Sequence, residues 1–116
     1  MDLDQFTPFV LVATFSMLLA VQCLAATSDA TAALYRSRCA ACHGGKGESN
    51  TPMARKANIP SFASEAVRNL SGAEVEDFIL FGGKERLASH TYFYKGISRN
   101  EGSQLAVYVK DLGSGK

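Results

Sequence analysis

The sequence predicts an all-α fold of three or four short helices joined by long loops. Two Ser-x-x-Glu patterns precede apolar residues at helical spacing, and a glycine follows each of these segments. No run of strand length alternates between apolar and polar residues. A chain of 116 residues has room for a single core, so we expect one small helical domain after an apolar leader.

The leader is typical of a secretory signal peptide. Residues 9–26 are almost unbroken apolar sequence and end on two alanines. The run is also close to the length that spans a bilayer, about 20 residues, and two aspartates stand where basic residues usually begin a signal. We therefore expect residues 1–26 to be a signal peptide or an N-terminal membrane anchor. Residues 27–116 would then be an exported domain, in the periplasm or an equivalent compartment.

The charge of the chain argues against nucleic acid as a partner. All 12 basic residues follow the leader, whereas two of the 11 acidic residues, Asp2 and Asp4, lie in it. Residues 27–116 therefore carry 12 basic against 9 acidic side chains, a net charge of +3. This charge is mild, and no basic run or aromatic-interleaved stripe accompanies it.

The first helix of the domain is expected from about Asp29 to Cys42. It delivers a pair of cysteines at its C-terminal end. A loop is expected over residues 44–52, where three glycines precede Asn-Thr-Pro. Glycine frees the backbone and proline cannot continue a helix, so the first helix cannot extend through this segment.

Two helices are expected in the middle of the chain. The shorter runs from Ser64 to Leu70, with the Ser64 side chain accepting a backbone N–H as the N-cap. The longer begins at Ser71, because the Ser71 hydroxyl and the Glu74 carboxylate each satisfy a backbone donor in a capping box. It is expected to end at Gly82.

The last helix has the clearest pattern in the chain. Ser98 and Glu101 repeat the capping box, and Gly113 ends the segment. Apolar residues recur between them at the i, i+3, i+4 and i+7 positions of one helix face, namely Leu105, Tyr108, Val109 and Leu112.

The residues that carry chemistry are Cys39, Cys42 and His43, which form a C-x-x-C-H pattern. This pattern is typical of the attachment of c-type haem. Two thiols about one helical turn apart can each add to one vinyl group on a porphyrin edge, and the adjacent imidazole can bind the iron. The sequence therefore predicts one covalent haem c, with His43 as an axial ligand. Covalent haem attachment takes place outside the cytoplasm, in agreement with the leader.

Other kinds of site also use closely spaced cysteines. A structural zinc site needs four ligands, and His43 is too close to Cys42 for comfortable tetrahedral geometry. The candidate zinc ligands of the domain are Cys39, Cys42, His43 and His90. A thioredoxin-like redox pair requires a preceding strand and a βαβ context, which the sequence lacks. Haem is the favoured prediction, with a zinc-clasped interaction module as an alternative.

Residues from about Thr31 to Leu112 resemble the small class I cytochrome c family. Tyr35 stands four residues before C-A-A-C-H, an H-G-G-K-G loop follows, and L-A-V-Y-V-K-D-L forms the last helix. The resemblance implies a cytochrome c-like fold in which the first and last helices pack, with Tyr35 against Leu105, Tyr108 or Leu112. It also implies a monohaem electron carrier rather than an enzyme, with redox proteins as partners.

Further expectations concern the surroundings of the haem. Loops as long as these normally need a reason, and a large flat cofactor wrapped by them would give one. Six aromatic residues are expected to cover it, namely Phe62, Phe78, Phe81, Tyr92, Phe93 and Tyr94. The alternative is that these aromatic residues only fill a small protein core. The resemblance implies that a backbone carbonyl, from Pro60 or a nearby residue, accepts the Nδ1–H of His43.

The chain departs from the family at the sixth iron ligand. Family members usually place a methionine before an aromatic-Lys-Gly segment, and here residues 89–98 contain none. His90 lies in this segment, so we expect it to be the sixth ligand. Met53 is the alternative ligand, although apolar filler is its favoured interpretation. Two imidazoles stabilise Fe(III) better than a thioether does, so a low potential is expected. An open or displaceable sixth position would instead indicate a gas-binding or sensing domain.

Overall fold

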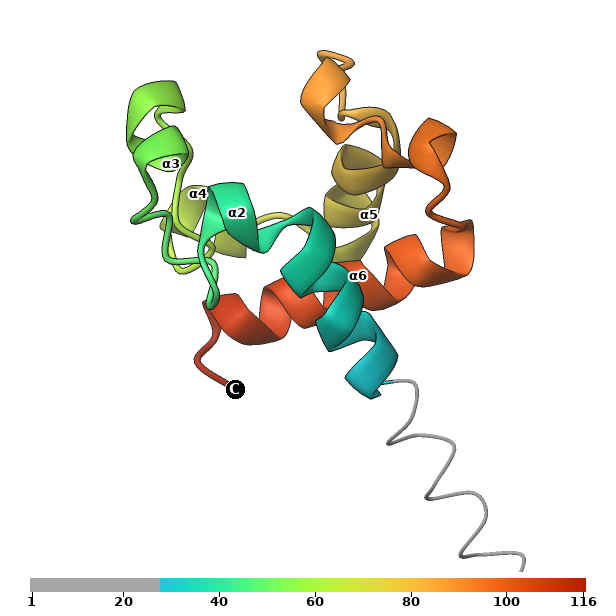
Figure 1. The fold of residues 1–116 in the computed structure, drawn as a ribbon, viewed down its shortest axis with the longest axis horizontal. Coiled ribbons are helices and arrows are strands. Elements are labelled where there is room, and N and C mark those ends of the chain that lie inside the picture. Colours follow the sequence, from blue (N-terminus) through green and yellow to red (C-terminus); the bar gives the residue numbers. More distant parts are fainter. Residues whose placement is uncertain (1–27) are drawn as a thin grey trace, which may run out of the picture. The chain divides into compact units, whose positions relative to one another are not determined.

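The computed structural model describes residues 28–116, and in this range the chain is all-α with no β-strand (Figure 1). The prediction of an all-α chain is confirmed for these residues. The chain divides into two compact units, Met1–Ala30 and Thr31–Lys116, and only the helical residues 28–30 of the first unit are described. The predicted signal peptide or membrane anchor, residues 1–26, lies outside the described residues. No helix within residues 28–116 is both long and apolar enough to span a bilayer.

The described chain has more helical segments than the three or four expected. Residues 28–38 are helical, and the elements that follow are α2 (Ala40–His43), α3 (Pro52–Ala57), α4 (Glu65–Arg68), α5 (Gly72–Phe81), η2 (Ala88–His90), η3 (Tyr92–Lys95) and α6 (Arg99–Gly113). The elements η2 and η3 are single turns of 3-10 helix. The additional segments are short: α2 lies at the end of the predicted first helix, whereas α3, η2 and η3 lie where no helix was predicted.

Both predicted capping boxes are present. The Ser71 amide donates to the Glu74 carboxylate at 2.8 Å, and the Glu74 amide donates to the Ser71 hydroxyl at 3.2 Å. Ser98 and Glu101 form the same pair at the start of α6, at the same two distances. The prediction for Ser64 is wrong in one respect. Its backbone occupies the N-cap position of α4, but its hydroxyl is buried, makes no capping bond and has no partner.

The helix α3 replaces part of the predicted loop. Thr51 caps it, because the Thr51 hydroxyl accepts the Ala54 amide at 3.0 Å. Pro52 occupies the first helical position, where its missing N–H costs no hydrogen bond. The Thr51 hydroxyl also donates to the Cys42 carbonyl at 2.5 Å. The start of α3 is therefore tied to the cysteine motif.

The predicted single helix from Asp29 to Cys42 is interrupted. The backbone turns at Cys39, whose φ of −120° and ψ of −40° are not helical, and α2 begins at the next residue. The Cys39 carbonyl accepts the amides of Cys42 at 3.2 Å and His43 at 3.0 Å. The three motif residues thus share one helical turn of their own.

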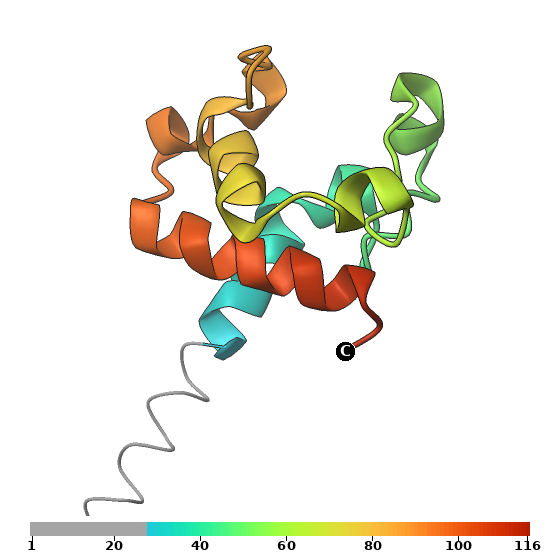
Figure 2. The same ribbon diagram turned by 180° about the vertical axis from the view of Figure 1, so that it is seen from behind.

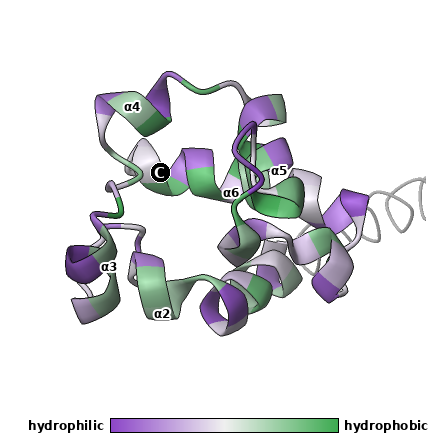
Figure 3. Cartoon of the chain, turned by 90° about the horizontal axis from the view of Figure 1, so that it is seen from above, coloured by the Kyte–Doolittle hydropathy of each residue, from purple (hydrophilic) through white to green (hydrophobic). Residues whose placement is uncertain are grey.

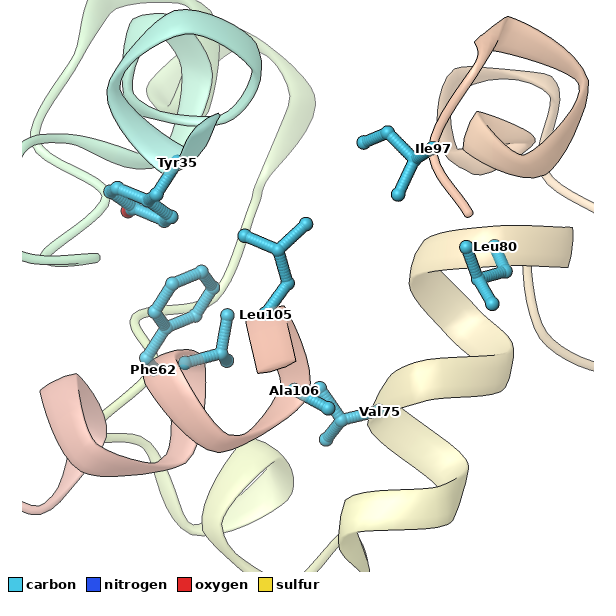
Figure 4. Close-up of a cluster of buried hydrophobic side chains, with 8 residues drawn as sticks. Tyr35, Phe62, Val75, Leu80, Ile97, Leu105 and Ala106 are labelled. Carbon is cyan, nitrogen blue, oxygen red and sulfur yellow. The ribbon is translucent and has the colours of Figure 1, made fainter. Parts of the chain in front are cut away.

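The core lies where residues 31–38 and α5 pack against α6 (Figures 1 and 2). Tyr35 and Leu105 are fully buried, and Figure 4 shows the Phe62 ring directed toward Leu105. The Tyr35 ring lies 5.2 Å from the Tyr108 ring between centroids. The expected packing of Tyr35 against the last helix is therefore confirmed.

The helices α5 and α6 approach closely because Gly102 has no side chain. A Cβ atom at Gly102 would lie 2.7 Å from the side chain of Leu80, which is fully buried on α5. In Figure 3, α5 shows apolar colour beside α6, whereas α3, which carries Arg55 and Lys56, includes strongly hydrophilic residues. The segments η2 and η3 pack on α5. The position of His90 therefore depends on this helix pair.

Candidate cofactor site

The cysteine pair lies at the junction between residues 28–38 and α2. Cys39 and Cys42 are both free thiols and both half-buried. Burial raises the pKa of Cys39 to about 11, and the neighbouring Cys42 adds to this shift. Both side chains are available for a covalent bond, and Cys39 is held as a thiol rather than a thiolate at neutral pH.

The two predicted axial ligands are close together in space, although they come from different parts of the chain. His43 ends α2, and His90 ends η2. Their ring centroids are 5.8 Å apart, with an angle of 64° between the ring planes. The fold therefore brings together the only two histidines of the sequence.

This separation fits a metal ion held between two imidazoles. Metal–imidazole bonds are about 2.0 Å long and a ring centroid lies about 1.2 Å from each nitrogen, so opposed axial rings have centroids about 6.4 Å apart. The observed 5.8 Å is close to this value. The angle between the planes presents no obstacle, because two axial imidazoles rotate independently about their bonds to the metal.

Both histidines are held in the neutral form that metal ligation requires. Burial, with a smaller contribution from the neighbouring His90, lowers the pKa of His43 from 6.5 to about 4. Burial also lowers the pKa of His90, with a smaller contribution from the charge of Lys95. A neutral imidazole keeps a lone pair on one nitrogen, so each ring can donate to a metal at pH 7.

The second nitrogen of each ring has a different environment. The Nδ1 atom of His90 is 3.0 Å from the Ser89 hydroxyl, which leaves Nε2 available as the ligand atom. The Nδ1 atom of His43 is buried and has no hydrogen-bond partner. The Pro60 carbonyl, expected to accept from His43, instead accepts the Ser49 hydroxyl at 2.9 Å. The expectation for Pro60 is therefore not met, because the His43 Nδ1 atom makes no hydrogen bond to this carbonyl.

Three of the six predicted aromatic residues line the histidine pair. Phe62 lies 4.9 Å from the His43 ring, and Phe78 and Tyr92 lie 5.0 Å and 6.3 Å from the His90 ring, between centroids. Phe62 is buried, whereas Phe78 and Tyr92 are half-buried. These rings form an apolar wall around the two imidazoles.

The other three aromatic residues form a separate surface cluster, so their predicted role of covering the cofactor finds no support in these contacts. The Phe81 and Phe93 centroids are 5.3 Å apart, and the Arg99 guanidinium lies over both rings. Tyr94 stacks edge-on against Phe93 and is 77% exposed. Consecutive aromatic residues cannot all face one side of a short helical turn, and sequence spacing alone did not separate the two groups.

Met53 lies on the exposed surface of α3. Half of its side chain is exposed, so it does not fill the core, and the interpretation as apolar filler is wrong. Within residues 28–116, no three His, Cys, Asp or Glu side chains gather closely enough to hold a metal ion. The four residues considered for zinc therefore do not form one cluster in this part of the chain.

The Tyr92 hydroxyl makes a contact that was not predicted. It donates a hydrogen bond of 2.9 Å to the carbonyl of Arg38, the residue before the cysteine motif. Burial raises the pKa of Tyr92, and the nearby thiols of Cys39 and Cys42 add to the shift. Tyr92 thus lies beside the cysteine pair as well as beside His90. No local sequence pattern announces a contact between residues so far apart in the chain.

Comparison of the chain with protein-family models, with curated proteins and with solved structures finds no match. The function proposed below therefore rests on the residues and their geometry.

Proposed function

We propose that residues 27–116 form an exported monohaem cytochrome c domain with a cytochrome c-like fold, and that it carries single electrons between redox proteins. The observation that supports this most directly is the 5.8 Å separation of the His43 and His90 rings, one of which directly follows Cys42. The two histidines that the proposal uses as iron ligands are thus close together, and one of them is adjacent to the cysteine pair.

The chain's own residues have distinct roles in this proposal. The thiols of Cys39 and Cys42 each add across one vinyl group, so that sulfur bonds to one carbon and the proton goes to the other. His43 and His90 bind the iron from its two faces. Bound haem supplies a one-electron Fe(III)/Fe(II) couple. Phe62, Phe78 and Tyr92 exclude water from the imidazoles.

With two nitrogen ligands, the reduction potential of the iron is expected to be low. Imidazole donates more strongly to Fe(III) than a thioether does, so the oxidised state is favoured relative to a His/Met cytochrome. The aromatic wall also removes water from around the ligands, and exclusion of solvent acts on the potential as well. We therefore expect the two histidine ligands to place the reduction potential below that of a His/Met cytochrome.

The first experiment tests covalent haem in the exported full-length chain. Acid–acetone extraction should leave one haem per chain on the polypeptide. Cys39→Ala or Cys42→Ala should reduce haem retention, and the double replacement should leave a largely unfolded protein, because cofactor burial contributes much of the small core. Complete extraction of the colour from the unmodified chain would refute the proposal.

The second experiment tests the ligand pair by comparing His90→Ala with Met53→Leu. The oxidised protein should be low-spin and should lack the far-red sulfur-to-iron charge-transfer band. His90→Ala should raise the spin state and allow carbon monoxide to bind the reduced iron, whereas Met53→Leu should change neither property. An unmodified protein that already binds carbon monoxide rapidly would favour the gas-binding alternative. The opposite pattern for the two variants would assign the thioether as the ligand.

A further inference from the structure

Tyr92 connects two segments of the candidate site that are far apart in the sequence. It begins η3, two residues after His90, and its hydroxyl donates to the Arg38 carbonyl at 2.9 Å. Arg38 directly precedes Cys39. One side-chain hydrogen bond therefore joins the segment with the second histidine to the segment with the cysteine pair.

The Tyr92 side chain is held on several sides. Its ring meets the His90 ring edge-on at 6.3 Å, and the Lys95 ammonium lies 4.9 Å from its centroid. The Tyr92 carbonyl accepts the amide of Ile97 at 3.0 Å, and Ile97 is buried in the core. The phenol is thus directed at Arg38 by a backbone that the core fixes.

The other side-chain hydrogen bonds in this region stay within residues 88–95. The Lys95 ammonium donates to the carbonyls of Ala88 and Ser89 at 3.0 and 3.5 Å. The Thr91 hydroxyl donates to the Ala88 carbonyl at 3.1 Å. These bonds join residues 88–95 to one another, so they stiffen the segment without tying it to the cysteine motif.

We propose that Tyr92 is a positioning residue that latches residues 88–95 against the cysteine-bearing helix and so limits the exchange of His90 for an external ligand. This inference rests on the proposed haem ligation and adds a kinetic role for one hydroxyl. Loss of the hydroxyl removes the bond to Arg38 and leaves the ring, with its contact to His90, in place. Residues 88–95 then move away from the motif more often, and an external ligand reaches the iron in those intervals.

The test compares the rates of cyanide binding to the oxidised holoprotein and to its variants. Tyr92→Phe should bind cyanide roughly two- to tenfold faster, the range that corresponds to one net hydrogen bond. Tyr94→Phe is the matched control, because Tyr94 is 77% exposed on the same turn. It should bind at the unmodified rate. Both variants should keep the low-spin spectrum of the unmodified protein and one haem per chain.

A second control separates the latch from general stability. Lys110→Met removes two hydrogen bonds, to the carbonyls of Arg68 at 2.6 Å and Leu70 at 2.5 Å, that join α6 to the region of α4. It should lower the thermal midpoint while leaving the cyanide rate unchanged. If Lys110→Met and Tyr92→Phe accelerate binding equally, Tyr92 acts through stability alone and the inference is overturned.

Two further outcomes separate a failure of the Tyr92 latch from a failure of the proposed haem ligation. If Tyr92→Phe binds cyanide at the unmodified rate while His90→Ala binds it much faster, the latch is wrong and the ligand pair stands. If His90→Ala binds cyanide no faster than the unmodified protein, His90 is not the displaced ligand, and the proposed ligation fails together with the latch.

Discussion

Tyr35 and Gly44 are joined by a hydrogen bond of 2.7 Å, in which the phenol donates to the backbone carbonyl immediately after His43. Tyr35 is fully buried, and burial raises the pKa of its phenol, so the donor stays protonated at neutral pH. The central residue of the core therefore also fixes the turn by which the chain leaves the cysteine motif.

Replacing Tyr35 by Phe should destabilise the protein by about 0.5–1.5 kcal/mol, because the Gly44 carbonyl loses one of its two donors and keeps the Gly47 amide at 3.2 Å, while the apolar packing is kept. Denaturant unfolding of the holoprotein measures the change. Tyr108→Phe is a suitable control, since Tyr108 packs on Tyr35 and is only half-buried. If the free energy of unfolding falls equally in the two variants, the hydrogen bond from Tyr35 to Gly44 makes no specific contribution to stability.

Replacing Gly102 by Ala should cost about 1–3 kcal/mol, because the new Cβ atom would overlap the Leu80 side chain and push α5 away from α6. Gly72→Ala is the control, since a Cβ atom at Gly72 meets nothing within 4 Å. It should be neutral or slightly stabilising. Thermal unfolding compares the two, and an unchanged midpoint for Gly102→Ala would contradict the close contact.

Protonation of His43 should destabilise the haem-free chain. His43 takes up a proton near pH 6.5 when unfolded but only near pH 4 when folded, so the unfolded state binds more protons between these values. The free energy of unfolding should therefore fall as the pH drops through this window. Circular dichroism of the haem-free chain between pH 7 and pH 4 measures the loss of folded protein, and a folded fraction that does not change across this range would contradict the lowered pKa.

Removing the Ser89 hydroxyl should raise the reduction potential. Its bond to the His90 Nδ1 atom makes the imidazole a stronger donor, which favours Fe(III). A threefold to tenfold change in relative ligand affinity corresponds to about 30–60 mV for one electron. Redox titration of Ser89→Ala measures it, with the exposed Ser103→Ala on α6 as control. A shift shared by both variants would exclude a specific effect at His90.

Features set by local chemistry could be predicted from the sequence. The two capping boxes need only residues three apart, and both formed as expected. Ser64 did not act as a side-chain cap although it precedes a helix, because a four-residue helix binds its cap weakly and the hydroxyl became buried. The Thr51-Pro52 signal for α3 was present in the sequence, but the neighbouring glycines and asparagine favoured a loop.

Features set by contacts between distant residues could not be predicted in this way. The proximity of His90 to His43 followed only from a resemblance, whereas the bonds from Tyr92 to Arg38 and from Ser49 to Pro60 had no sequence signal. The pairs formed by His90 and Tyr92 depend on how α5 and α6 carry the last third of the chain past the first helix. Tertiary packing of that kind cannot be read from any short stretch of the sequence.

The two histidines belong to different packing neighbourhoods. His43 lies on α2 against Phe62, whereas His90 lies on η2, which packs on α5. Under the proposed function, the cofactor cross-links two halves that would otherwise open separately. Amide hydrogen exchange should therefore distinguish them once His90→Ala breaks the cross-link, with exchange accelerating in residues 84–97 and little changed in residues 40–57. The iron would thus make two local unfolding units behave as one cooperative domain.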